Sequence, residues 1–393
     1  MSARRSLALL VMLCAVMASS ALFEQPLPAS QPVRPPLGEV ALGRLAFEDP
    51  LLSQSGLQSC ASCHAASAGH AAPNGLAVQP GGVHLERRGL RAAQTLGYLA
   101  TNGPFHFDAE GKAMGGFFWD GRADSLAAQA AGPLLGDTEM AHPSPASVAQ
   151  AIARTHWVDA FKALYGQRIL DNPHAAFERL TQALARYQSD DPAFQSFSSK
   201  FDAVLRGQAT LTAQEARGLE LFNAPDKGNC AECHPSAKQP DGSHPLFTDF
   251  SYDTLGVPRN PAIPANSNPA HFDLGLCARP ELRQRLDLCG AFKVPTLRNV
   301  ARRPVYFHNG RFDSLREATL FYVQRDTHPQ KWYPRGADGR VKVFDDLPQS
   351  LHGNVNREAP YDRKRGQMPA LSDAQVDDVV AFLHTLTDGW NAP

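Results

Sequence analysis

Two pentapeptides with the pattern Cys-x-x-Cys-His constrain this 393-residue chain more than any other feature. The first is Cys60–His64 (CASCH) and the second is Cys230–His234 (CAECH). A cysteine pair of this spacing with an adjacent histidine is the attachment pattern of c-type haem. The two thiols can each form a thioether to a haem vinyl group, and the histidine can ligate the iron. The sequence therefore predicts two covalently bound haem c groups.

The patterns also assign the haem-binding residues. The attachment residues are Cys60, Cys63, Cys230 and Cys233, and the proximal iron ligands are His64 and His234. Zinc would need four ligands gathered in one site, and a redox dithiol needs no following histidine. Because the complete pattern occurs twice, we favour haem over both alternatives.

The N-terminus has the features of a secretory signal. Arg4 and Arg5 precede an apolar stretch from Leu7 to Met17, and small residues up to Ala21 suit cleavage. That stretch is too short to cross a bilayer, and no run of about 18 apolar residues follows it. We expect residues 1–21 to be removed and the mature protein to be periplasmic, without a membrane span.

Cys277 and Cys289 flank a short charged segment. An exported chain can keep such a pair as a disulfide, which would stabilise the fold by roughly 3 kcal/mol. Free reactive thiols are the alternative. We expect a structural disulfide with no part in catalysis.

An internal repeat divides the mature chain into two halves. Leu42–Phe47 (LGRLAF) precedes the first haem pattern, and Arg217–Phe222 (RGLELF) precedes the second. Each half closes with a predicted helix. One spans Pro173–Tyr187 after the cap residue Asn172, and the other starts at Ser372 with apolar residues at helical spacing. Each haem pattern is therefore framed by two helices.

These features predict a mainly α fold with two cytochrome c-like domains, each carrying one covalent haem and long loops. The N-terminal domain is expected to span residues 35–206 and the C-terminal domain 207–393. No strand-rich segment of convincing length competes with this interpretation. With a formal net charge of -1, the chain shows no bias towards nucleic acid or anionic membranes. Its 31 prolines and 30 glycines suit long loops around cofactors.

The sequence resembles the bacterial di-haem cytochrome c peroxidases, and within them the MauG-like branch that oxidises residues of partner proteins. The resemblance covers nearly all of the mature chain. Besides the haem patterns, it rests on Phe118–Ala123 (FWDGRA), Lys293–Val300 (KVPTLRNV) and Tyr306–Gly310 (YFHNG). It implies that hydrogen peroxide reacts at the His64 haem and that oxidising equivalents are shared with the His234 haem.

The resemblance also implies catalytic residues. Trp119 is expected between the haems, although a tryptophan outside such a motif would more often pack in a core. Gln129, Pro133 and Glu139 are expected in the distal pocket of the N-terminal haem. Glu139 could move a proton between the peroxide oxygens, and Gln129 could orient the bound oxygen through a hydrogen bond. Pro133 would add bulk without a donor.

The sixth ligand of the His234 haem distinguishes branches of the family. Ordinary peroxidases have a methionine there and MauG has a tyrosine, and the matching residue here is Tyr322. A phenolate stabilises oxidised iron through its hard anionic oxygen. The alternative is Met368, just before the final helix, where single-haem cytochromes c place an axial methionine. His84 falls near a mobile distal histidine of ordinary peroxidases, but its surroundings match poorly, which favours a solvated loop histidine.

Relatives hold a calcium ion between the domains with an asparagine side chain and two backbone carbonyls. The matching positions here are Ala92, Arg303 and Val305. The carboxamide is lost and a guanidinium is gained, so we predict that no calcium binds there.

Three functions remain open. The first is oxidation of aromatic residues of a partner protein, and the second is peroxide reduction with electrons from a small cytochrome or cupredoxin. The third is a non-enzymatic electron carrier, for which a distal acid such as Glu139 would have no use. Tyr322 argues against the second function. We therefore predict a peroxidase that oxidises a protein substrate, with the small redox protein as the alternative partner.

Overall fold

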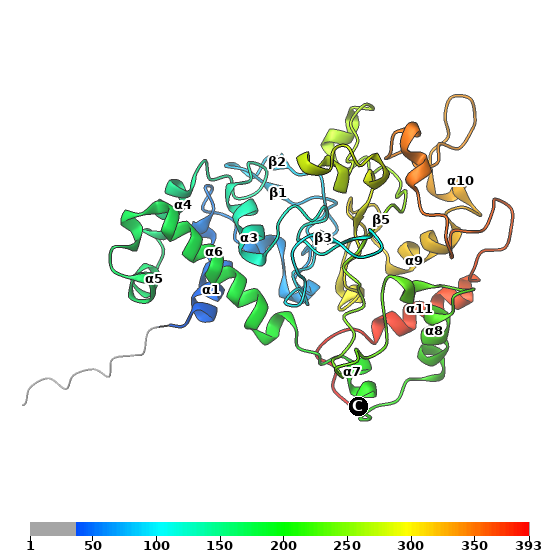
Figure 1. The fold of residues 1–393 in the computed structure, drawn as a ribbon, viewed down its shortest axis with the longest axis horizontal. Helices are drawn as coiled ribbons and strands as arrows, with labels where there is room; N and C mark the ends of the chain where they lie inside the picture. The colour runs from blue at the N-terminus through cyan, green and yellow to red at the C-terminus, as the bar shows by residue number, and fades with distance from the viewer. Residues whose placement is uncertain (1–36, 393) are drawn as a thin grey trace, which may run out of the picture. The chain divides into compact units, whose positions relative to one another are not determined.

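The computed structural model describes residues 37–392, so the predicted signal sequence at residues 1–21 lies outside the described residues. Helices dominate the described chain, and its strands are only two residues long (Figure 1). The strands form three antiparallel pairs. They are β1 (Pro80–Gly81) with β2 (Arg87–Arg88), β3 (His106–Phe107) with β4 (Ala113–Met114), and β5 (Tyr252–Asp253) with β6 (Phe292–Lys293). The predicted mainly α fold with long loops is confirmed.

Helices α1 (Glu39–Glu48) and α6 (Pro173–Asp190) form the centre of the N-terminal half. Asn172 caps α6 as predicted, because its side chain accepts a hydrogen bond from the backbone N–H of Ala175 at 3.2 Å. Three further helices gather at the same end of the molecule (Figure 1): α3 (Leu126–Leu135), α4 (Pro145–Ile152) and α5 (Val158–Tyr165). Their apolar faces bury a core around Trp157 and Phe161.

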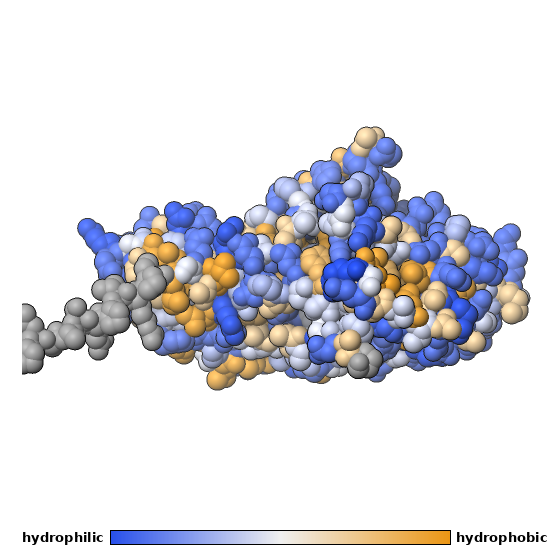
Figure 2. Space-filling model, turned by 90° about the horizontal axis from the view of Figure 1, so that it is seen from below, coloured by the Kyte–Doolittle hydropathy of each residue, from blue (hydrophilic) through white to orange (hydrophobic). Residues whose placement is uncertain are grey.

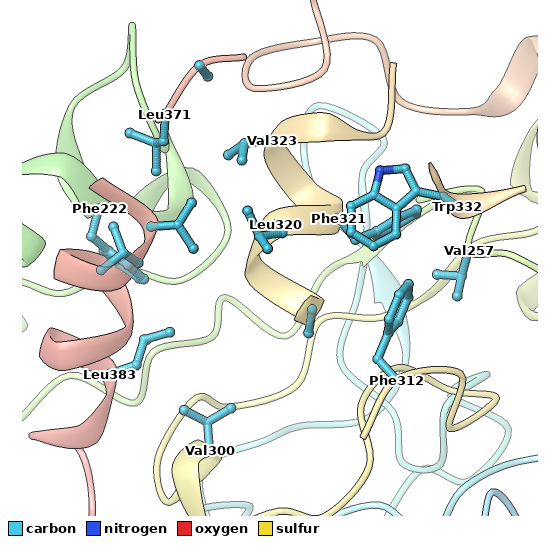
Figure 3. Close-up of a cluster of buried hydrophobic side chains, with 14 of the residues drawn as sticks. Phe222, Val257, Val300, Phe312, Leu320, Phe321, Val323, Trp332, Leu371 and Leu383 are labelled. Carbon is cyan, nitrogen blue, oxygen red and sulfur yellow. The ribbon is translucent and has the colours of Figure 1, made fainter. Parts of the chain in front are cut away.

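The C-terminal half repeats this plan with α8 (Ala213–Asn223) and α11 (Asp373–His384). Both helices begin with a capping box, so both N-termini are encoded locally. Helix α9 (Leu315–Gln324) packs against α11, and Figure 3 shows side chains of both helices, including Leu320 and Leu383, in one hydrophobic core. The shorter helices are α2 (Cys60–Cys63), α7 (Lys200–Leu205) and α10 (Pro329–Trp332). The boundary proposed between residues 206 and 207 lies between α7 and α8.

Glycines at equivalent positions let each helix pair cross closely. A Cβ atom at Gly43 in α1 would collide with the backbone carbonyl of Ala183 in α6. A Cβ atom at Gly218 in α8 would collide with the backbone carbonyl of Asp378 in α11. The repeated segments found in the sequence each contain one of these glycines, so the repeat encodes a shared mode of helix packing.

Cys277 and Cys289 form a disulfide, as the sequence predicted. The loop that it closes lies against the β3–β4 hairpin, with Leu276 and Leu282 buried beside Ala113. Within residues 37–392, no helix is long and apolar enough to cross a membrane. Figure 2 shows a face on which hydrophilic residues surround small hydrophobic areas.

Gly218→Ala is expected to lower the free energy of unfolding by about 1–3 kcal/mol, because the added methyl group forces α8 away from α11. This destabilisation is expected even though alanine is the better helix former by about 1 kcal/mol. Gly353→Ala is the control, since Gly353 is exposed and a methyl group added there would meet no atom within 4 Å. Denaturant unfolding of the haem-loaded protein measures both. Equal stability of the two variants would contradict the packing argument.

Candidate active site

The first haem pattern borders a cavity that we call the N-terminal cavity. Helix α2 is a single turn that begins with a capping box of Ser59 and Ser62. His64 follows this turn directly. The Nδ1 atom of His64 lies 3.2 Å from the carbonyl oxygen of His70, which leaves Nε2 for a metal. Burial lowers the pKa of His64 to about 4, so its imidazole is neutral, as metal ligation requires.

The second haem pattern borders the C-terminal cavity. Cys230, Cys233 and His234 line it together with Tyr322 of α9. The Nδ1 atom of His234 lies 2.8 Å from the carbonyl oxygen of Phe247, and burial lowers the pKa of this histidine. The two predicted proximal histidines are therefore oriented by the same kind of backbone contact.

Both cavities fit a covalently bound haem. The four cysteines of the haem patterns are not joined to one another, whereas the remaining pair in the described chain is a disulfide. Apolar side chains that could cover a porphyrin line the C-terminal cavity: Phe222, Val294, Leu297, Val300, Leu371 and Leu383. Figure 3 shows Phe222, Val300, Leu371 and Leu383 in the core that also contains side chains of α9. Within residues 37–392, no group of three or more His, Cys, Asp or Glu side chains is placed to hold a metal ion.

Trp119 lies in the wall that separates the two cavities, because it lines both of them. Its indole Nε1 donates a hydrogen bond to the carbonyl oxygen of Ala92 at 2.9 Å. Ala92, Ala93 and Gln94 also line both cavities, as does Lys293. An aromatic side chain thus borders both predicted haem sites.

The structure also brings the predicted distal residues together. Gln129 and Pro133 of α3 and Glu139 of the following loop line the N-terminal cavity with His64. Burial raises the pKa of Glu139, and Asp137 adds to the increase while Arg122 opposes it. A carboxyl group with a raised pKa beside a cavity is suited to exchange a proton with a bound substrate.

The two candidates for the sixth ligand of the second haem lie in different environments. The Tyr322 ring is half-buried, and its centroid lies 5.6 Å from that of Phe307 and 5.9 Å from that of Tyr361. Burial raises the pKa of the Tyr322 hydroxyl. Met368 is 76% exposed and lines neither cavity, because its segment runs over the surface after Gly366 bonds to Thr327. Met368 therefore lies outside both cavities in this structure, and the choice of Tyr322 as the sixth ligand stays a prediction.

His84 is exposed on the loop between β1 and β2 and lines neither cavity. Its backbone N–H donates to a carboxylate oxygen of Glu86 at 3.0 Å, which fixes the local loop. The placement matches the favoured interpretation of His84 as a solvated loop histidine.

Arg303 occupies a position where relatives supply a calcium ligand. Its Nη2 donates to the carbonyl oxygens of Thr296 and Arg298, at 2.7 and 2.8 Å. Ala92 and Val305, at the other two matching positions, pack in one small apolar cluster. These side chains offer a cation no oxygen ligand. That no calcium ion binds here in the haem-loaded protein stays a prediction.

The sequence analysis missed an ion-pair chain beside Trp119. Arg91 binds the Asp273 carboxylate through two hydrogen bonds of 2.6 and 2.7 Å, and its third nitrogen pairs with Asp120 at 2.7 Å. Arg91 lines the N-terminal cavity and Asp273 the C-terminal cavity. Asp120 belongs to the FWDGRA motif, but nothing local in the sequence indicates its distant partners.

Two other buried polar groups face the cavities. The Tyr361 hydroxyl is buried, and no hydrogen-bond partner lies within reach among the described residues. A hydroxyl in that state beside a cavity is expected where a cofactor completes the site. Burial lowers the pKa of Lys293 to about 7, and its Nζ donates to the carbonyl oxygens of Gly115 and Phe250. Lys293 opens the KVPTLRNV motif, which was the one available signal for it.

Comparison with known proteins now defines the class. The family model for di-haem cytochrome c peroxidases matches residues 38–210. Methylamine utilization protein MauG of Paracoccus denitrificans is 39% identical over 355 residues, which cover 88% of each chain. Cytochrome c peroxidase Ccp of Escherichia coli is 28% identical over 92% of this chain and 60% of its own.

Solved structures agree with this class. The crystal structure of the diheme peroxidase BthA from Burkholderia thailandensis has a TM-score of 0.82 and 42% identity, covering 91% of this chain and 87% of that chain. The protein therefore belongs to the di-haem cytochrome c peroxidase and MauG family, and it is an oxidoreductase of the peroxidase class.

Glu139→Gln is expected to change how stability depends on pH. The native pKa of Glu139 is raised, so the native state binds more protons than the unfolded state between the two pKa values. The free energy of unfolding of the parent should therefore fall as pH rises through that window, relative to the variant. Denaturant unfolding of the haem-loaded protein between about pH 4 and pH 8 measures the difference.

The exposed Glu110 in the β3–β4 loop provides the matched control, Glu110→Gln. If the free energy of unfolding depends on pH in the same way in Glu139→Gln and Glu110→Gln, the raised pKa of Glu139 does not contribute to stability.

Proposed function

We propose that this protein is an exported di-haem enzyme that reacts with hydrogen peroxide at the N-terminal cavity and oxidises aromatic side chains of a partner protein. The observation that carries the proposal is the position of Trp119 between the two cavities. On one side lie a carboxyl group and an amide suited to peroxide, and on the other side lies the phenol of Tyr322.

The N-terminal cavity would perform the peroxide step. A haem held by Cys60, Cys63 and His64 would supply the iron that activates peroxide. Glu139 lines this cavity and could pass a proton to the leaving oxygen, and desolvation there raises its pKa. The Gln129 amide can donate a hydrogen bond that orients the bound oxygen.

The C-terminal cavity would store an oxidising equivalent. Tyr322 would offer a phenolic oxygen as a further ligand to an iron held by His234, and such a hard ligand favours oxidised iron. The Phe307 and Tyr361 rings on either side of Tyr322 fix its orientation. Electrons would move from this side towards the N-terminal cavity through Trp119.

The protein substrate would dock on the outside and lose electrons without entering a cavity. We propose the periplasm as the compartment, because covalent haem attachment and a disulfide both suit an exported chain. The similarity to cytochrome c peroxidase Ccp favours a second candidate function, which is peroxide reduction with electrons from a small cytochrome or cupredoxin.

Stoichiometric peroxide added to the fully ferric protein without a reductant tests the proposal. We expect a long-lived near-infrared absorption that reports charge shared between the two haems, and about a tenfold loss of its amplitude in Trp119→Phe. Trp157→Phe is the matched control, because this buried indole bonds to Asp49 at 2.9 Å and lines neither cavity. A protein that reacts only after one haem is reduced would be an ordinary cytochrome c peroxidase.

Tyr322→Phe is expected to change the absorption and raise the reduction potential of the C-terminal haem, because the iron loses an anionic oxygen ligand. Potentiometric titration of the haem bands measures the shift. Tyr165→Phe removes a hydroxyl that donates to Glu39 at 3.1 Å, and neither residue lines a cavity, so this variant should leave the potential unchanged. The same small response in both variants would eliminate Tyr322 as a ligand.

A further inference from the structure

The turn that carries Trp119 depends on contacts from outside. Phe118 and Gly121 both adopt left-handed backbone conformations, with φ of 67° and 64°, and a bridge between Phe117 and Ala123 closes the turn. A left-handed conformation is unfavourable for a phenylalanine, so the surrounding structure must stabilise it. The direction of the indole follows from this backbone.

The stabilising contacts come from the disulfide-closed segment, which we define as Asp273–Lys293. Arg279 lies inside the disulfide loop and is only 9% exposed. Its Nη1 donates to the carbonyl oxygen of Gly121 at 2.8 Å, while its other nitrogens bind Glu281 at 2.8 and 2.5 Å. Its guanidinium also lies 4.2 Å from the centroid of the Phe105 ring.

The two ends of the segment contact the neighbouring residues of the same turn. At one end, Asp273 holds Arg91, which pairs with Asp120. At the other end, the backbone N–H of Lys293 donates to the carbonyl oxygen of Trp119 at 2.9 Å. The segment, about 150 residues further along the chain, thus bonds directly to Trp119 and Gly121. It is joined to the intervening Asp120 through Arg91.

The segment itself is closed in two ways. The disulfide joins Cys277 to Cys289, and near its base the backbone N–H of Leu276 donates to the carbonyl oxygen of Ala291 at 2.9 Å. A closed loop has few alternative conformations, so its polar groups keep their positions. A buried charge such as that of Arg279 contributes little to stability compared with an apolar residue. Its use here is therefore to fix the position of the turn that carries Trp119.

We propose that the disulfide-closed segment positions Trp119, with Arg279 and Asp273 as positioning residues that set the coupling between the two haem sites. The inference rests on the proposed function of Trp119. It assigns to the Cys277–Cys289 disulfide a part in electron transfer, beyond support of the fold.

Arg279→Met tests the proposal, because it removes the donor to Gly121 and leaves the disulfide intact. In the haem-loaded protein, we expect about a tenfold slower electron equilibration between the haems after pulse reduction with less than one electron per molecule. Hydrogen exchange of the backbone amides in residues 115–124 should also accelerate. Arg279→Lys should restore part of both properties, since it keeps a donor.

Arg283→Met is the matched control, because this exposed arginine of the same loop bonds only within the loop, to Pro280 at 2.9 Å. The Cys277→Ser, Cys289→Ser double variant should shift both readouts in the same direction as Arg279→Met. If Arg279→Met lowers only the thermal stability, with equilibration and exchange equal to those of Arg283→Met, the segment is merely structural and the proposal is overturned.

The outcomes separate this inference from the proposed function. Loss of equilibration in Trp119→Phe but not in Arg279→Met supports the function of Trp119 and overturns positioning by the segment. Normal equilibration in Trp119→Phe overturns the function of Trp119, and the inference fails with it.

Discussion

The close crossing of two helix pairs at Gly43 and Gly218 is the constraint on which the rest of the structure depends. Each crossing brings a helix backbone against a carbonyl of the closing helix, so no side chain separates them. The first helix of each pair leads directly into a cysteine pattern, and the closing helix covers the core behind it. Helix packing thereby sets the position of both histidines beside the cavities.

The wall between the cavities is held by a different kind of force. Hydrogen bonds and ion pairs fix Trp119 and its neighbours, and the charged groups among them are largely removed from water. Such groups add little net stability but penalise any displacement strongly, because a shifted partner would leave a buried charge unpaired. The molecule therefore uses apolar packing to form its two halves and polar contacts to fix the residue that lies between them.

Sequence reasoning succeeded where the chemistry is local. The cysteine patterns, the cap at Asn172 and the Cys277–Cys289 pair all depend on residues close together in the chain, and the structure contains each feature. It failed where polar partners are far apart, as for Arg279 and Gly121, because a single long-range hydrogen bond leaves no periodic trace in the sequence. Met368, the alternative ligand, is a related case, since the position of a residue before a helix does not determine whether it turns inwards.

The two cavities carry different polar groups, and each group suits a different step of the proposed reaction. Peroxide cleavage needs a proton donor beside the reacting oxygens, and Glu139 lies only at the N-terminal cavity. Removal of electrons from a distant aromatic residue needs a site that stays oxidised, and Tyr322 lies only at the C-terminal cavity. Under the proposed function, the two demands are met at separate sites. The Trp119 indole between the cavities would connect these sites, because a fixed aromatic ring can pass electrons with little movement of its own atoms.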